Sequence, residues 1–125
     1  MKTLAEVPDI LGDYPGEMQM LTYEIGAEQV ALTYRRMPQH TGGKGSYGHF
    51  HDEQEEVYFV ISGRLQFKLG DDVIEAEKGT AIRVAPEVVR SVWNDEPEDA
   101  ELVIVSKRTA DPQGDVKTVP DFWPE

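Results

Sequence analysis

The stretch GKGSYGHFHDEQEEVYFVISG, residues 43–63, carries the strongest information on the fold. It places His49 and His51 two residues apart, so both imidazoles leave the same face of an extended chain. Glu56 follows five residues after His51 and opens the run 57–61, whose β-branched and aromatic residues favour a strand. Two strands joined by the acidic link between them would bring two imidazoles and a carboxylate together. That donor set is typical of a 2-His-1-carboxylate metal site.

Composition restricts the classes of function. A chain of 125 residues forms one domain with its own core, and the absence of cysteine excludes disulfide and thiolate chemistry. Lys and Arg total 12 against 24 Asp and Glu, for a net charge of -12. Such a surface repels nucleic-acid phosphates and anionic lipids. With no signal-peptide core and no apolar run of membrane length, we expect a cytoplasmic protein that binds neither nucleic acid nor membranes.

Short apolar runs separated by Gly and Pro predict many strands and few helices. Residues 18–24 and 29–37 are predicted to form a hairpin, and Pro38 ends its second strand. The further predicted strands are 57–61, 65–69, 73–77, 80–84, 88–93 and 102–105. This pattern favours an all-β fold, a jelly-roll or double-stranded β-helix barrel.

The ends of the chain lack this pattern. We expect an irregular N-terminal arm, a barrel and a C-terminal tail, at residues 1–17, 18–107 and 108–125 respectively. Pro120 and Asp121 predict a one-turn helix in the tail. Burying Phe122 and Trp123 is worth roughly 2 to 3 kcal/mol each. The tail is therefore expected to dock on the barrel or on a partner subunit.

The central stretch resembles the first signature of the cupin superfamily: Gly, five residues, His-x-His, three or four residues, Glu, six residues, Gly. Gly43, His49, His51, Glu56 and Gly63 fill every fixed position. The resemblance implies a cupin β-barrel whose two histidines and glutamate ligate a divalent metal, which would be iron, manganese, nickel or zinc. Because the central strand is apolar on both faces, something must cover its outer side. Cupins commonly dimerise through such a face, which implies a homodimer.

A second, weaker signature lies at residues 79–94. Pro86 and Asn94 match it, but Glu87 stands where Gly is usual, and Arg90 stands where the fourth metal ligand, a histidine, is expected. A guanidinium is always protonated and has no lone pair, so Arg90 cannot ligate a cation. The resemblance therefore supplies three protein ligands rather than four.

Two interpretations of this site follow. In the first, His49, His51 and Glu56 hold a metal with open positions, and Arg90 holds a carboxylate or enolate of a small ligand. The resemblance then implies an enzyme of the dioxygenase or isomerase type. In the second, Arg90 forms an ion pair with Glu56 in a metal-free pocket, which binds a small ligand such as a sugar or carboxylate without turnover.

Several further residues are candidates near the site. Gln54 is a possible replacement ligand through its amide oxygen, and Glu55 would replace Glu56 only if the strand register slipped by one residue. His40, in the Gly-rich loop 39–48, is expected to be solvated, with an extra ligand or substrate contact as the alternative. The aromatic residues that line either the pocket or the core are Tyr34, Tyr47, Tyr58 and Trp93.

Overall fold

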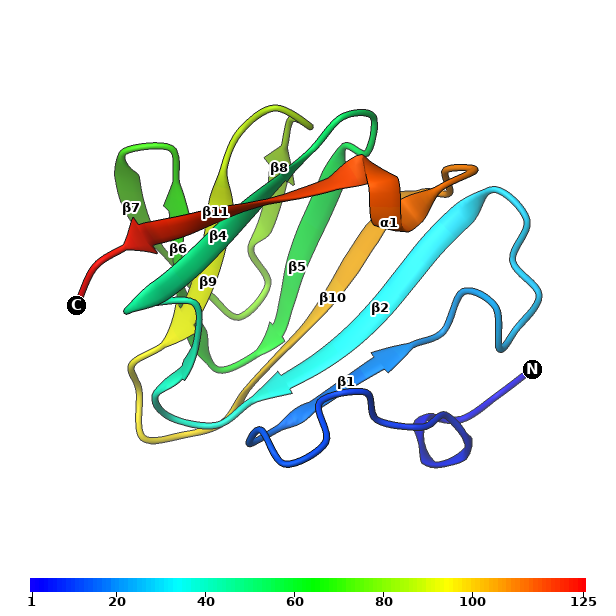
Figure 1. Cartoon of the computed structure of the whole chain (residues 1–125). Helices are drawn as coiled ribbons and strands as arrows, with labels where there is room; N and C mark the ends of the chain where they lie inside the picture. The colour runs from blue at the N-terminus through cyan, green and yellow to red at the C-terminus, as the bar shows by residue number, and fades with distance from the viewer.

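The computed structural model describes residues 1–125 as two antiparallel β-sheets that face each other (Figure 1). The first sheet has the order β1 (Glu17–Met20), β2 (Val30–Met37), β10 (Ala100–Lys107), β5 (Glu56–Ser62) and β8 (Ala81–Val84). The second has the order β11 (Val116–Trp123), β4 (Ser46–His51), β9 (Arg90–Asn94), β6 (Arg64–Leu69) and β7 (Asp72–Glu77), with β3 (Thr41–Gly42) also paired to β9. The only helices are the 3-10 turn η1 (Leu4–Glu6) and α1 (Pro112–Asp115), and neither is long enough to span a bilayer. The predicted all-β, double-stranded β-helix fold is confirmed.

The apolar core lies between the sheets and is continuous with the polar site. Along β5 the inward-facing side chains are Glu56, Tyr58 and Val60, of which Val60 has 0% exposure. Tyr58 packs edge-on against Phe67 of β6, with ring centroids 5.4 Å apart. The strand that carries the candidate carboxylate is therefore anchored by the core two residues further along.

The predicted N-terminal hairpin is present but shorter than expected. Strand β1 pairs with β2 in antiparallel register, from Glu17 opposite Arg36 to Met20 opposite Thr33. The chain then leaves the ladder, because backbone hydrogen bonds such as that from the Ala27 N–H to the Thr22 carbonyl close a turn. Local turn bonds thus compete successfully with the strand pairing that alternation alone predicts.

The N-terminal arm lies along β1 and leaves the outer side of β5 open. The Gln19 amide donates to the carbonyls of Leu4 and Val7, at 2.6 and 2.8 Å, and Val7 is buried. Phe59, on the outer face of β5, keeps 38% of its surface exposed. The expectation that a second subunit covers this face stays a prediction.

The C-terminal tail differs from the sequence-based expectation. The predicted helix at Pro120 and Asp121 is wrong: both residues lie in β11, which runs beside β4. The ladder with β4 is interrupted between Val119 and Trp123, so Pro120, which has no N–H to donate, sits where no pairing is needed. The single turn of helix comes earlier, at α1, where Asp111 caps it by accepting a hydrogen bond from the Gly114 N–H. Trp123 is 5% exposed, so the tail docks on the barrel of its own chain.

Candidate metal centre

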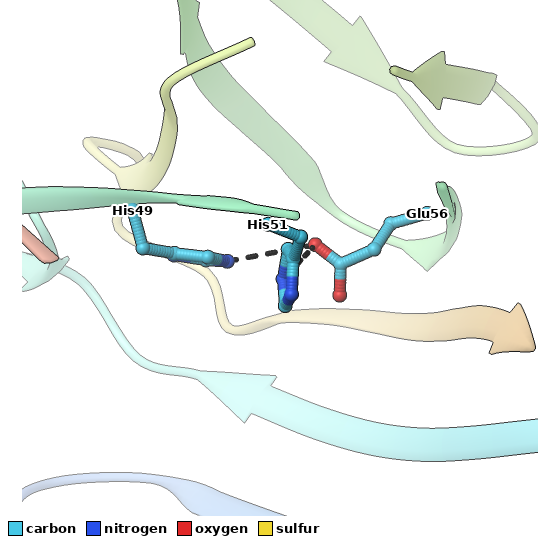
Figure 2. A group of neighbouring side chains, drawn as sticks. All are labelled: His49, His51 and Glu56. Atoms are coloured by element: carbon cyan, nitrogen blue, oxygen red, sulfur yellow. Dashed lines mark ion pairs between the residues drawn. The ribbon is translucent and has the colours of Figure 1, made fainter. Parts of the chain in front are cut away.

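Two strands that follow each other in the sequence, one in each sheet, bring three candidate ligands together inside the barrel. His49 and His51 alternate on β4, and Glu56 begins β5 (Figure 2). The Glu56 Oε1 lies 3.5 Å from the His49 Nε2 and 3.3 Å from the His51 Nε2. The two imidazoles are nearly perpendicular, at 85°, and their centroids are 5.1 Å apart. The convergence predicted from the spacing is therefore present in the structure.

The dimensions of this cluster fit a first-row divalent cation. One donor atom from each residue lies within 4.8 Å of the others. Metal bonds of about 2.0–2.1 Å to nitrogen and oxygen separate adjacent ligand atoms by about 3.0–3.4 Å, close to the two distances found between the Glu56 Oε1 and the histidine nitrogens. The His51 Nε2 is also buried and makes no hydrogen bond. A buried ring nitrogen beside a carboxylate, with no hydrogen bond of its own, suits a metal ligand.

Asp115 supports the cluster from the opposite side and was not predicted from the sequence. Its Oδ2 lies 3.1 Å from the His51 Nδ1, and its side chain is only 4% exposed. The same carboxylate accepts hydrogen bonds from the backbone N–H groups of Glu53 and Gln54, at 2.7 and 3.2 Å, in the link between β4 and β5. Asp115 thus orients the imidazole and also holds the link that positions Glu56. A carboxylate on Nδ1 favours the tautomer whose Nε2 lone pair is free for a metal.

Asp115→Asn is expected to weaken metal binding about 10- to 100-fold, the usual cost of losing such an orienting partner. The amide cannot accept every hydrogen bond that the carboxylate accepts, so the free energy of unfolding should also fall, by about 1–3 kcal/mol. Isothermal titration with Zn²⁺ and urea unfolding measure the two effects. Asp111→Asn is the matched control, because asparagine caps a helix as well as aspartate and Asp111 does not contact His51. Equal Zn²⁺ affinity in Asp115→Asn and wild type would contradict the assigned role.

Glu56, the one acid among the three candidate ligands, has a strongly shifted pKa. Burial raises its pKa, but the imidazoles of His49 and His51 and the charge of Arg90 outweigh burial and hold the pKa well below its usual range. The Tyr58 hydroxyl donates to the same Oε1 at 2.8 Å. Burial and the nearby Glu56 charge raise the pKa of Tyr58, which keeps the phenol protonated as a donor. Glu56 is therefore an ionised carboxylate, as a metal ligand must be.

Arg90 reaches the same carboxylate from β9. Its backbone pairs with His49 across the ladder, and its Nε lies 3.1 Å from the Glu56 Oε1. The side chain is 1% exposed, and its Nη1 donates to the carbonyls of Pro86 and Val88 at 3.1 and 2.6 Å. The buried Nη2 has no hydrogen-bond partner. The ion pair expected for a metal-free pocket is thus present beside a ligand set that suits a metal.

The structure separates the predicted aromatic residues. Tyr58 lies within the site and contacts Glu56, whereas Tyr47, on the same face of β4 as the histidines, is 56% exposed. Tyr34 lies on the outer face of β2, where its hydroxyl donates to Glu101, so its assignment to the pocket is corrected. Both faces of β2 carry large polar or aromatic side chains, so the sequence pattern did not distinguish them.

The remaining polar candidates lie outside the cluster. The Gln54 side-chain amide donates to the Lys107 carbonyl at the surface, which does not favour its predicted role as a ligand. Glu55 forms an exposed ion pair with Arg83, as expected if the strand register does not slip. His40 is exposed in its loop and stacks on Trp93, with ring centroids 6.0 Å apart.

The comparisons with known proteins agree with the fold described above. The Cupin domain family matches residues 36–106. Among solved structures, a sugar phosphate isomerase of the cupin superfamily from Silicibacter pomeroyi is 18% identical, with 100% of this chain and 96% of that chain covered and a TM-score of 0.75. The polyketide cyclase RemF from Streptomyces resistomycificus is 19% identical, with 95% and 84% covered and a TM-score of 0.75. A proposed sugar phosphate isomerase from Acidithiobacillus ferrooxidans is 17% identical, with 86% and 64% covered and a TM-score of 0.65. Comparison with curated proteins finds no match.

The two facing sheets and the inward His-His-Glu cluster define a small β-barrel with a candidate metal centre. Since the family match covers more than half of the chain, the chain belongs to the cupin family. At identities below a fifth, the solved structures establish the fold and leave the reaction to be argued from the site.

Proposed function

We propose that this cupin is an enzyme of the isomerase or dioxygenase type, which holds a divalent cation through His49, His51 and Glu56 and acts on a small anionic molecule. The observation that carries the proposal is the position of His51. The Asp115 carboxylate lies 3.1 Å from the His51 Nδ1. The buried Nε2 of His51 has no hydrogen-bond partner and lies 3.3 Å from the Glu56 carboxylate. An imidazole oriented in this way is arranged to bind a metal.

The charges of the site favour an anionic ligand. A divalent cation together with Arg90 would exceed the carboxylates of Glu56 and Asp115 by one positive charge. The bound cation would supply Lewis acidity toward a carbonyl or enolate oxygen. The chain's own groups would orient the ligand, with the unpartnered Nη2 of Arg90 as a donor beside it. The names of two structural neighbours, an isomerase and a cyclase, are consistent with chemistry on small molecules in this fold.

The second candidate function is a metal-free binding protein for a sugar or carboxylate. The ion pair between Arg90 and Glu56 favours it, because a guanidinium and a cation compete for the same carboxylate oxygen. In that case the imidazoles of His49 and His51 would be hydrogen-bonding groups for the ligand. A homodimer and a cytoplasmic location are parts of the proposal under either function; the apolar outer face of β5 and the acidic, cysteine-free composition support them.

Elemental analysis of untagged protein, purified without chelator, tests the metal directly. We expect about one equivalent of iron, manganese, nickel or zinc per chain, because three ligands and open positions suffice for tight binding. The metal-loaded and chelated proteins should then be compared for turnover of a panel of sugar phosphates and small carboxylates, with oxygen uptake recorded. Turnover that depends on metal supports the enzyme. Protein that contains no metal and gains none on dialysis against each ion would overturn the proposal in favour of the binding protein.

A further inference from the structure

Arg35 is a second arginine inside the barrel, on the inner face of β2. In the ladder between β2 and β10 it lies opposite Leu102, a core residue with 0% exposure. Met37, two residues along the same strand, is also fully buried, and side chains two apart share a face. The adjacent Arg36 points to the outside and forms ion pairs with two surface carboxylates. Arg35 therefore faces the interior of the barrel, whereas Arg36 faces the outside.

The guanidinium of Arg35 has no acidic partner. Its Nε is buried and makes no hydrogen bond, and the ionisable groups that act on it are the phenols of Tyr14, Tyr47 and Tyr58. Burial lowers the pKa of Arg35, but an arginine remains protonated in proteins, so a positive charge stays in the barrel. Arg35 is half-buried, and a partly desolvated charge without a counter-charge is destabilising, so proteins normally pair it or use it to bind something.

Arg35 differs in this respect from Arg90, which the sequence had marked as the anion contact. Arg90 is already compensated: its Nε lies beside the Glu56 carboxylate and its Nη1 donates to two backbone carbonyls. No carboxylate in the chain compensates Arg35 in this way. The uncompensated charge inside the barrel is therefore that of Arg35.

The strand ladders place Arg35 on the inner face that leads to the candidate metal centre: Arg35 pairs with Leu102 of β10, and Leu102 pairs with Val60 of β5, on the same face as Tyr58 and Glu56. Tyr14 and Tyr47 are 42% and 56% exposed, whereas Tyr58 is 3% exposed and donates to Glu56 at 2.8 Å. The influence of all three phenols on the pKa of Arg35 agrees with this placement. A ligand whose anionic end lies at Arg35 would extend inward toward Glu56.

We propose that Arg35 binds the anionic group, a carboxylate or a phosphate, of the small molecule that this barrel holds. The unmatched guanidinium supplies the charge and a fork of donors, a geometry that matches both kinds of oxyanion. The inference rests on the proposed function only in assuming that the barrel interior takes a small ligand. It does not require the metal.

The test compares Arg35→Met with Arg36→Met, which removes a neighbouring arginine from the outer face. Binding of inorganic phosphate and of succinate is measured separately by calorimetric titration and thermal shift, against sodium chloride at equal ionic strength, on chelated and metal-loaded protein. We expect at least one anion to bind wild type, Arg36→Met to bind it equally, and Arg35→Met to bind it at least about tenfold more weakly, as for loss of a charged hydrogen bond. Without anion, Arg35→Met should be as stable as wild type or more stable, because a half-buried, unpaired charge is removed. A purely structural arginine would give the opposite sign.

The outcomes distinguish this inference from the proposed function. Tighter binding of phosphate identifies a phosphorylated ligand, and tighter binding of succinate a carboxylate. If Arg35→Met binds both anions as tightly as wild type, or if neither anion binds wild type, the inference is wrong. If no protein takes up metal but anion binding still depends on Arg35, the metal-dependent function fails and the inference stands. Should Arg35→Met not fold, Arg35→Gln, which is neutral but polar, serves for the same comparison.

Discussion

His49→Ala is expected to abolish metal binding and to leave the fold intact. The substitution removes one of three protein ligands, which should weaken binding by more than about 100-fold, since loss of an orienting partner alone costs 10- to 100-fold. The His49 side chain is 30% exposed, against 7% for His51, so its removal should change the free energy of unfolding by less than about 1 kcal/mol. Metal per chain, measured by elemental analysis, and a urea unfolding curve report the two quantities.

His40→Ala is the matched control for that experiment. His40 is 63% exposed, stacks on Trp93 and lies outside the His-His-Glu cluster. The His40→Ala variant should retain the metal content of wild type. If His49→Ala and His40→Ala contain equal amounts of metal, the cluster is not the metal site, whatever its geometry.

Arg90→His should raise the affinity for Zn²⁺ or Mn²⁺ at least about tenfold. The substitution removes a cation that competes for Glu56 and places a third imidazole beside the three ligands, as a possible fourth ligand. The same change loses the two hydrogen bonds that Arg90 donates to backbone carbonyls. The free energy of unfolding of the metal-free protein should therefore fall by about 1–3 kcal/mol, and added metal should restore it.

Arg83→His is the control for Arg90→His, because Arg83 forms its ion pair with Glu55 at the surface. It should leave both metal affinity and stability unchanged within about 0.5 kcal/mol. Titration with each metal alone, on chelated protein, gives the comparison. A folded Arg90→His variant that binds metal no better than wild type would show that Arg90 does not oppose the cation.

Much of the site could be predicted from the spacing of its residues in the sequence. His49 and His51 share a face because alternate residues of a strand point the same way, and Glu56 opens the next strand after a short link. The position of Arg90 followed from the second signature, and its ion pair with Glu56 was one of the two expected arrangements. These predictions depend on residues close in sequence or on a register that the strand pattern determines.

Other features had no local signal. Asp115 lies in a polar tail, and it reaches His51 only because β11 runs along β4 and α1 turns the chain at the end of that strand. One turn of helix was predicted at Pro120 and Asp121 in this tail, since the two residues suit a helix start as well as an interruption in a ladder. Strand pairing with a distant segment decided between the two.

The sequence alone determined that the chain forms a β-barrel with a His-His-Glu cluster, because strand alternation and short links restrict where His49, His51 and Glu56 can point. Only the tertiary structure decided which groups surround that cluster. The pairs of adjacent side chains on β2 illustrate the reason: Tyr34 and Arg35 are equally compatible with either face, and a shift of one residue exchanges them. The ladders with β1 and β10 set the register, which turns Arg35 inward and leaves its charge without a partner.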